Sequence, residues 1–230
     1  MKALAVDLAV SKLTVAAKNE DHTVSASYYI GMKQSETLLP AIDYILEKSG
    51  LKKSELDYLT LSAGPGSFTG LRLCFAALKA IEMAFNCPLY GVSSLDAYAE
   101  HYLSLPFTIV SCIDAKKEKF YAKIWENKNI ILDEGDYEIS VIAEKLASEK
   151  KAVLICGSDA ELLKQKLLKS DNSLETKEMH TVNFTVNTAE QLFIITERMI
   201  KAGKKPLNDY DGPVYLRASE AEEKKAVENK

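Results

Sequence analysis

The sequence predicts an α/β protein in which one order of strands and helices occurs twice along 230 residues. Each half opens on apolar strands, and in each half an aspartate ends the first strand six residues before its partner strand begins. These pairs are Asp7 with Leu13 and Asp114 with Phe120. Three strands followed by helix, strand and helix are then expected in each half.

Seven elements are expected in the first half. The residue patterns predict strand, strand, strand, helix, strand, helix and strand at 4–9, 13–18, 23–30, 35–49, 56–63, 69–85 and 88–92. Ser35 is the candidate N-cap of the first helix, and Gly50 supplies its C-terminal stop. Pro40 fits within the first turn or two of that helix, where its missing N–H costs little.

The second half repeats the first six of these elements, which are expected at 107–114, 119–126, 130–135, 141–149, 152–157 and 159–170. A last helix is expected at 188–202. Asp159 is the candidate cap of the penultimate helix. We expect an N-terminal lobe over 1–105, a C-terminal lobe over 106–217 and a disordered tail over 218–230. The last helix, 188–202, belongs to the second lobe or packs back on the first.

The duplicated order fits two lobes of an actin-like (ASKHA) fold, each with a mixed sheet of three antiparallel strands followed by alternating helix and strand. A three-strand antiparallel opening argues against plain βαβ winding. Periodicity alone nevertheless leaves a Rossmann-like or other α/β fold open.

Composition narrows the class of protein. The net charge is −4 and the pI about 5.6, without the basic surplus typical of a protein that grips nucleic acid alone. Asp7 and Lys12 interrupt the N-terminal apolar run, which argues against a signal peptide, and no stretch approaches the ~20 apolar residues of a membrane span. A cytoplasmic protein is expected, with reduced core cysteines at 74, 87, 112 and 156.

The stretch SAGPGSFTGLR (62–72), here called the glycine loop, joins a predicted strand to a predicted helix. Pro65 and Gly66 suit the central pair of a type II turn, and Ser67 or Thr69 can cap the helix. The helix N-terminus would attract an anion, but the pattern is neither a Walker A loop nor GxGxxG. Phosphate contact and a merely tight turn remain equally open. The candidate nucleotide-binding residues are Asp7, Gly64, Gly66, Ser67 and Gly70.

The helix expected over 69–85 is apolar around most of its circumference, so it must be covered on two sides. One side suits the sheet. A second side of small residues suits close approach of another helix, either the helix at 35–49 or one from a partner subunit. The candidate interface residues are Leu38, Ile42, Leu73, Ala76, Ala77, Ala80 and Ala84. A narrow polar strip contains Arg72, Lys79, Glu82 and Asn86.

Catalytic candidates are scarce. The histidines at 22, 101 and 180 are isolated in the sequence, and no HxxxH, HExxH or GxSxG pattern occurs. Asp7 and Asp114 could hold a magnesium-bound nucleotide between lobes or could equally be turn formers. We therefore expect no catalytic set and no metal site.

Four segments together resemble one family. GPGSFTGLR (64–72), QSETLLPAI (34–42), IDAKKEKFYA (113–122) and PVYLRASEAE (213–222) are similar to motifs of the TsaB (YeaZ) family, and the first also to the catalytic paralogue TsaD. The four run in the family's order over nearly the whole chain. TsaD proteins carry a histidine pair for their metal on the first helix, whereas this chain has Gln34 and no histidine there.

The resemblance implies an actin-like two-lobed fold and a part in making threonylcarbamoyladenosine beside the anticodon of tRNA. It implies a non-catalytic partner that pairs with TsaD through the first-lobe helices, with the ATPase TsaE joining. A homodimer of the isolated chain stays open, and tRNA contact is expected only through the partner. No tightly bound cofactor is expected, although ATP or ADP, held weakly or at the partner interface, stays open.

One departure from the family bears on nucleotide binding. Asp7 is followed by Leu8 and Ala9, where the family usually has Thr–Ser, so the hydroxyls that would cradle a phosphate are missing. A stand-alone ATP-dependent kinase or a metallopeptidase-like hydrolase of the same fold is the alternative function.

Overall fold

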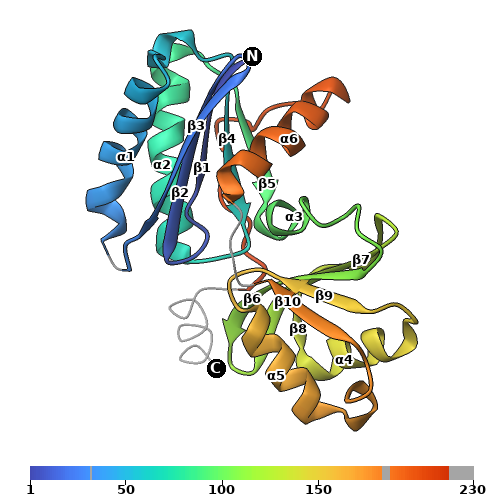
Figure 1. The fold of residues 1–230 in the computed structure, drawn as a ribbon. Helices are drawn as coiled ribbons and strands as arrows, with labels where there is room; N and C mark the ends of the chain where they lie inside the picture. Colours follow the sequence, from blue (N-terminus) through green and yellow to red (C-terminus); the bar gives the residue numbers. More distant parts are fainter. Residues whose placement is uncertain (32, 183–186, 218–230) are drawn as a thin grey trace.

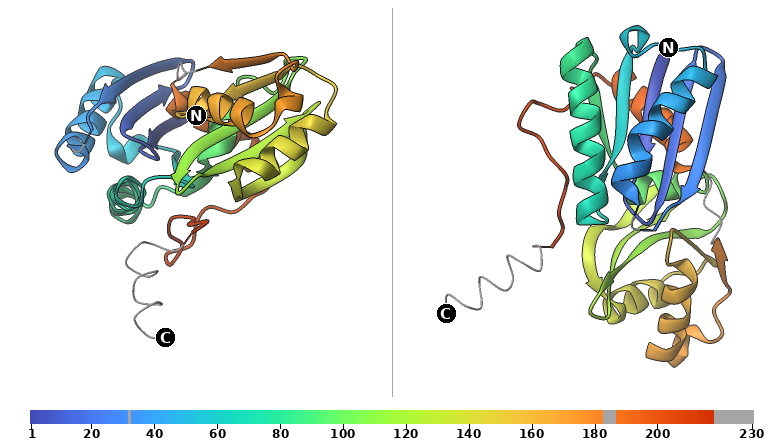
Figure 2. Two further views of the ribbon diagram at one scale, coloured as in Figure 1. Left: turned by 90° about the horizontal axis from the view of Figure 1, so that it is seen from below. Right: turned by 90° about the vertical axis from the view of Figure 1, so that its left-hand side faces the viewer.

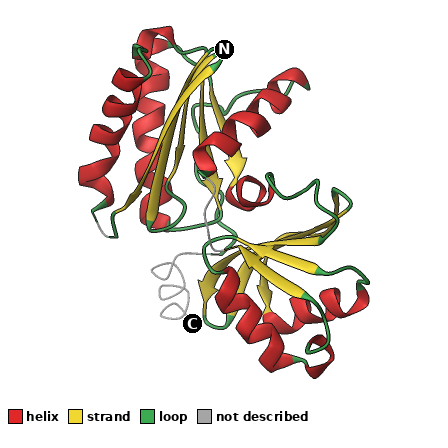
Figure 3. Ribbon diagram, viewed as in Figure 1, coloured by secondary structure: helices red, strands yellow, loops and turns green. Residues whose placement is uncertain are grey.

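The computed structural model describes residues 1–31, 33–182 and 187–217, which form two lobes, each built on a five-stranded mixed sheet (Figures 1 and 3). The first sheet has the order β3-β2-β1-β4-β5 and the second the matching order β8-β7-β6-β9-β10. In each, the three opening strands are antiparallel and the later strands run parallel to the first. The duplicated actin-like arrangement expected from the sequence is confirmed.

The first lobe has helices on both faces of its sheet. Its strands are β1 (Lys2–Asp7), β2 (Lys12–Asn19), β3 (His22–Tyr29), β4 (Tyr58–Gly64) and β5 (Leu89–Ser93). Helices α1 (Gln34–Lys48) and α2 (Phe68–Phe85) cover one face, and a short 3-10 turn, Lys53–Glu55, precedes β4 (Figure 1). Helix α6 (Thr188–Lys201) contacts β1, β2 and β4 from the other face, so it lies on the first lobe.

The second lobe contains β6 (Thr108–Lys116), β7 (Lys119–Glu126), β8 (Asn129–Glu138), β9 (Val153–Cys156) and β10 (Met179–Val182). Helices α4 (Ile139–Ser148) and α5 (Ala160–Ser170) pack on one face, with a 3-10 turn at Asn172–Leu174. The short helix α3 (Ser94–Ala99) is buried between the lobes, since it contacts β4 and α6 of the first lobe and β6 and β7 of the second.

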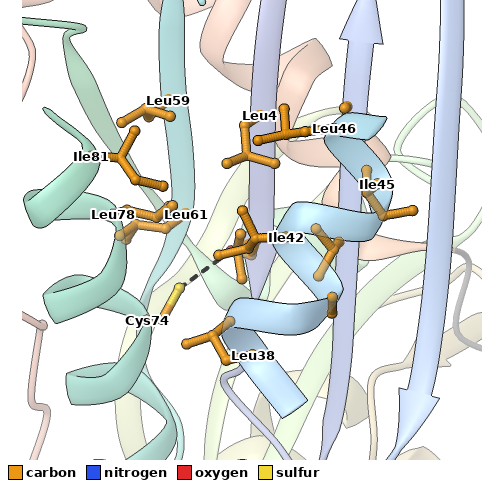
Figure 4. Close-up of a cluster of buried hydrophobic side chains, with 14 of the residues drawn as sticks. Leu4, Leu38, Ile42, Ile45, Leu46, Leu59, Leu61, Cys74, Leu78 and Ile81 are labelled. Atoms are coloured by element: carbon orange, nitrogen blue, oxygen red, sulfur yellow. Dashed lines mark hydrogen bonds between the residues drawn. The ribbon is translucent and has the colours of Figure 1, made fainter. Parts of the chain in front are cut away.

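The core of the first lobe lies between its sheet and the α1–α2 layer. Leu4 and Leu61 from the sheet meet Ile42 of α1 and Leu78 of α2, all almost fully buried (Figure 4). The Cys74 thiol of α2 points at the Val6 carbonyl of β1, 3.7 Å away. Because one stripe of each helix faces these strands, the helices are held side by side on the sheet.

Local details differ from the expectations at three places. Helix α1 begins at Gln34 with Lys33 at its N-cap position, so the prediction that Ser35 caps it is wrong. Asp159 does occupy the N-cap position of α5, but its carboxylate accepts the Asp114 N–H instead of capping. Helix α3 and strand β10 were not expected. Six residues are too few for a helical stripe, and β10, with one buried residue of four, lacks the continuous apolar run of β9.

Candidate partner-binding face and inter-lobe cleft

The glycines of the glycine loop allow three close backbone approaches. A Cβ at each would lie within 2.1–2.3 Å of a carbonyl oxygen: Gly64 against Val214, Gly66 against Ala9, and Gly70 against Leu8. Since a real side chain cannot enter such a space, glycine is required at all three positions by packing. The loop is therefore a junction at which the turn after β1 and the C-terminal segment meet.

Two backbone donors at the start of α2 are occupied within the chain. The Ser67 N–H donates to the Ala9 carbonyl over 2.7 Å, and the Ser67 hydroxyl accepts the Gly70 N–H at 3.3 Å as the N-cap of α2. The positive φ falls on Gly64, at 125°, before a cis peptide bond to Pro65. Gly66 has no positive φ, so the predicted type II turn centred on Pro65 and Gly66 is wrong.

Asp7 is buried, with 2% of its surface exposed, in a polar cluster between β1, β2 and α6. Its carboxylate accepts the Ala9 N–H at 2.9 Å and the hydroxyl of Thr188. The Thr188 hydroxyl also lies 2.8 Å from the Thr14 hydroxyl. Asp7 thus closes the turn after β1 and binds the first residue of α6 to the sheet.

Asp114 closes the equivalent turn of the second lobe. Its carboxylate accepts the Lys116 N–H at 2.9 Å and the Lys116 ammonium at 2.7 Å. Burial raises the pKa of Asp114, but these hydrogen bonds and the charge of Lys116 outweigh it and hold the pKa below its ordinary value. In both lobes the aspartate therefore forms the turn, one of the two roles left open by the sequence.

A cleft of about 450 Å³ lies between the lobes. Its lining comes from the turn after β1 and the glycine loop on one side and from the ends of β6, β7 and β9 on the other. The lining residues are Ala9, Val10, Ser11, Gly66, Ser67, Phe68, Ile113, Asp114, Ala115, Lys116, Tyr121, Ser158 and Asp159. Of the candidate nucleotide-binding residues, Gly66 and Ser67 line this cleft, whereas Asp7, Gly64 and Gly70 are not among its lining residues.

A second hollow of about 490 Å³ lies between α1 and α2 and is here called the α1–α2 groove. It is lined by Ser35, Leu38, Leu39, Ile42, Asp43, Lys53, Leu73, Ala76, Ala77, Ala80, Ile81 and Phe85. Leu39 is 55% exposed and Phe85 is 43% exposed, so the rim is apolar and open to solvent. Asp43 and Lys53 form an ion pair at one end, 2.5 Å apart.

The candidate interface residues divide into two groups at this groove. Leu38 and Ile42 are buried in the core, and Leu73 and Ala77 are half-buried against it. Ala76, Ala80 and Ala84 are exposed on α2. All except Ala84 line the groove, so the structure brings six of the seven predicted side chains to one surface.

Comparison with known proteins decides the family. The model of the TsaD family, described as tRNA N6-adenosine threonylcarbamoyltransferase, matches residues 31–224. The tRNA threonylcarbamoyladenosine biosynthesis protein TsaB of Bacillus subtilis is 29% identical over 233 residues, covering 97% of each chain. The chain belongs to the TsaD family, in its TsaB (YeaZ) branch.

Solved structures agree on the fold. YeaZ from Pseudomonas aeruginosa aligns with a TM-score of 0.76 at 18% identity, covering 94% of this chain and 99% of that one. The activator of the 2-hydroxyisocaproyl-CoA dehydratase from Clostridium difficile, solved with bound ADPNP, aligns at 0.51 and 10% identity, covering 90% and 100%. At these identities the likeness concerns the fold alone.

Helix α1 of the TsaB-like chain carries no histidine. Gln34 is buried, and its amide donates to the Val10 carbonyl at 3.5 Å. One turn later Leu38 packs in the core. Within the described residues, no three His, Cys, Asp or Glu side chains are grouped so that they could hold a metal ion. No helix in the described part of the chain is long and apolar enough to cross a membrane.

A third hollow, of about 370 Å³, lies at the C-terminal end of α4 and includes Lys150, Lys151 and Lys177. The Lys177 ammonium donates to the Glu149 carbonyl, the C-cap residue of α4. Cations are favourable beside the carbonyl end of a helix. The position of Lys177 is therefore explained by the helix terminus, and the Lys151 ammonium donates to the Asn127 side chain.

Sequence reasoning missed the role of the PVYLR motif of TsaB-like chains. Here Tyr215 stacks on Phe68 at the start of α2, and Arg217 forms two 2.8 Å hydrogen bonds with Asp136 of β8. The motif matched the family by letters alone. Its contacts join segments far apart in the sequence, so no local pattern could have revealed them. The rest of the PVYLRASEAE match, and the tail expected over 218–230, lie outside the described residues.

Proposed function

We propose that this chain is a non-catalytic subunit that pairs with a TsaD homologue and supports threonylcarbamoyl transfer to the adenosine beside the anticodon of tRNA. A TsaE homologue completes the set of partners. The α1–α2 groove is the observation that carries the proposal, and the names of the relatives support the pathway.

The groove has the character of a helix-docking surface. The exposed alanines of α2 let another backbone approach closely, while Leu39 and Phe85 offer apolar side chains beside them. Apolar surface of this kind, rimmed by an ion pair, is typical of protein contacts. A helical partner with an apolar stripe fits it best, which is the expectation from the family pairing through first-lobe helices.

The proposal that the chain is non-catalytic rests on the residue at position 34 and on the contacts of Asp7. Gln34 replaces the histidine of the family motif, and Asp7 is held by Ala9 and Thr188 in a buried cluster. An activated water needs a metal or a free base near a substrate. Transfer chemistry is therefore assigned to the partner.

We also propose that the isolated chain holds ADP or ATP weakly. The Ser67 N–H, one of the backbone donors that could face a phosphate at the start of α2, already donates to Ala9. The second-lobe wall of the cleft adds the carboxylates of Asp114 and Asp159, and the ammonium of Lys116 is paired with Asp114. Two negative groups facing a polyphosphate oppose binding. Equilibrium titration of the pure chain with a fluorescent adenine nucleotide tests this, and saturable tight binding would contradict it.

Ala80→Trp tests the pairing. Ala80 is exposed and lines the groove, whereas Ala77 packs against the core, so only the former can be enlarged without disturbing the fold. We expect Ala80→Trp to abolish co-elution with the TsaD homologue and to reduce threonylcarbamoyladenosine formation in a reconstituted reaction. The matched control is Ala147→Trp, on an exposed position of α4 in the second lobe.

Two outcomes would count against the proposal. Unchanged pairing of Ala80→Trp would remove the groove as the docking surface, and co-elution of this chain only with itself would make the groove a homodimer contact. The enzyme alternative is tested separately, by metal analysis and ATP turnover of the pure chain. Stoichiometric metal or substantial turnover would favour a kinase or hydrolase.

A further inference from the structure

The C-terminal segment over residues 207–217, here called the C-terminal strap, runs along the outside of the first lobe beside α2 and descends toward the second lobe (Figure 2). The Leu207 N–H donates to the Leu89 carbonyl of β5, and the Val214 N–H donates to the Ala63 carbonyl of β4, each over 2.7 Å. The strap is therefore bonded to the ends of two parallel strands of the first sheet.

The polar strip of α2 contributes to holding the strap. The Lys79 ammonium donates to the Asn208 carbonyl at 2.7 Å, and the Arg72 guanidinium donates to the Tyr215 hydroxyl at 2.9 Å. This strip lies on the opposite flank of α2 from the groove alanines. One flank of the helix thus faces the strap while the other stays open for a partner.

The strap ends in the second lobe. Arg217 forms a bidentate ion pair with Asp136 of β8, and its guanidinium also donates to the Ala115 carbonyl of β6 over 2.6 Å. Each side chain of the pair is only 16% exposed. Bidentate arginine–carboxylate pairs of this geometry are among the more specific and stronger ion pairs in proteins.

The lobes also meet at α3, where an apolar cluster joins Leu95 and Tyr98 to Ile109 and Trp125. Beside it Lys123 of β7 binds Asp96 of α3 at 2.9 Å. The Ser93 hydroxyl also donates to Glu134 of β8, so apolar and polar contacts both join the lobes at α3. The strap adds a second attachment, because Ala115 and Phe68, its neighbours in the two lobes, lie on opposite walls of the cleft.

We propose that the C-terminal strap is a clamp that fixes the angle between the two lobes, with Arg217 as the positioning residue that anchors it through Asp136. The clamp sets the width of the inter-lobe cleft and the orientation of the second lobe relative to α2. It acts within the isolated chain, so it stands or falls independently of the partner.

The test measures the distance between the lobes. Spin labels on Glu47→Cys in α1 and Glu144→Cys in α4 report this distance by double electron–electron resonance. Both positions are exposed, and the four native cysteines are buried, so labelling is selective. We expect a broader distance distribution in Arg217→Ala. Asp136→Asn, which keeps one acceptor oxygen, should broaden it less. Lys53→Ala, which breaks an ion pair within the first lobe, is the control and should leave it unchanged.

The charge-exchanged pair Arg217→Asp with Asp136→Arg separates the ion pair from general damage. We expect it to narrow the distribution relative to either single exchange. An unchanged distribution in Arg217→Ala would overturn the clamp. A broadened one that the exchanged pair fails to narrow would overturn Asp136 as the anchor. Circular dichroism confirms that each variant is folded, and Asp136→Asn remains informative should Arg217→Ala be unstable.

Discussion

The rings of Phe68 and Tyr215 stack with their centroids 4.3 Å apart and their planes 12° from parallel. Phe68 is the first residue of α2, and Tyr215 lies in the C-terminal strap. The Arg72 guanidinium lies 5.5 Å from the first ring centroid and 5.6 Å from the second. The start of the helix that carries the groove is therefore held by the end of the described chain.

Loss of this stack should lower stability. Aromatic pairs contribute about 0.5–1.5 kcal/mol beyond the area they bury, so Tyr215→Ala should lower the free energy of unfolding by about 1 kcal/mol or more. Tyr215→Phe keeps the stack and loses only the acceptor of Arg72, so we expect a smaller loss. Urea unfolding followed by fluorescence measures both. Equal losses in the two variants would show that the hydroxyl matters rather than the stack.

The glycine loop predicts a steric effect at Gly70. An alanine Cβ there would lie 2.1 Å from the Leu8 carbonyl oxygen, and that backbone is fixed between β1 and β2. Overpacking of this kind costs about 1–3 kcal/mol, so Gly70→Ala should lower the melting temperature clearly. Gly212→Ala is the matched control, because no atom lies within 4 Å of its Cβ position. Thermal unfolding in which the two variants behave alike would contradict the packing argument.

The contact between α6 and the first sheet should depend on pH through Glu197. Burial raises the pKa of Glu197, but hydrogen bonds from Lys18, 2.5 Å away, and Tyr58, 3.1 Å away, outweigh it and hold the pKa below its ordinary 4.5. A lowered carboxyl pKa stabilises the fold above the unfolded value, and the contribution is lost as pH falls through the folded value.

The variant Glu197→Gln isolates this contribution. We expect wild type to exceed Glu197→Gln in free energy of unfolding at neutral pH, and the difference to shrink as pH falls below about 4.5. Chemical unfolding at a series of pH values measures it. A difference that stays constant over that range would mean that the carboxylate charge contributes nothing.

The four cysteines should be unreactive in the folded protein. All are free and buried, and burial raises the pKa of Cys87 and Cys156 to about 12. Because the thiolate is the reactive form, a thiol reagent at pH 8 should modify the native protein far more slowly than the denatured one. In the denatured protein the reagent should modify four thiols per chain. Rapid modification of native protein would contradict this burial.

Helical stripes and continuous apolar strands were predictable from the sequence. The apolar stripes of α1 and α2 and the apolar strands β1, β4, β6 and β9 lie within a few residues of the expected ranges. Each is encoded by its own residues through the period of a helix or a strand. Helix α3 was missed because its six residues, which follow the N-cap Ser93, make too few turns to show an apolar stripe.

The residues that line the α1–α2 groove were predictable from the sequence, whereas the contacts of individual residues near the cleft were less so. The small-residue side of α2 follows from helical spacing, and six of the seven predicted side chains do line the groove. Turn formation by Asp7 was one of two roles that the sequence left open, but the contacts of Asp7 with α6 and of Gly66 with the turn after β1 were not predictable. Their partners, Thr188 and Ala9, are brought to them by the sheet and by α6, and no spacing in the sequence records that contact.

The sequence by itself determined the duplicated order of elements, the family and the small-residue flank of α2, because these depend on periodicity and on motif letters. Only the tertiary structure decided that the loop glycines pack against backbone carbonyl groups and that Arg217 pairs with Asp136 of the second lobe. The physical reason is distance along the chain. Contacts between segments far apart exist only after both sheets have formed, so neither partner carries a local signal of the other.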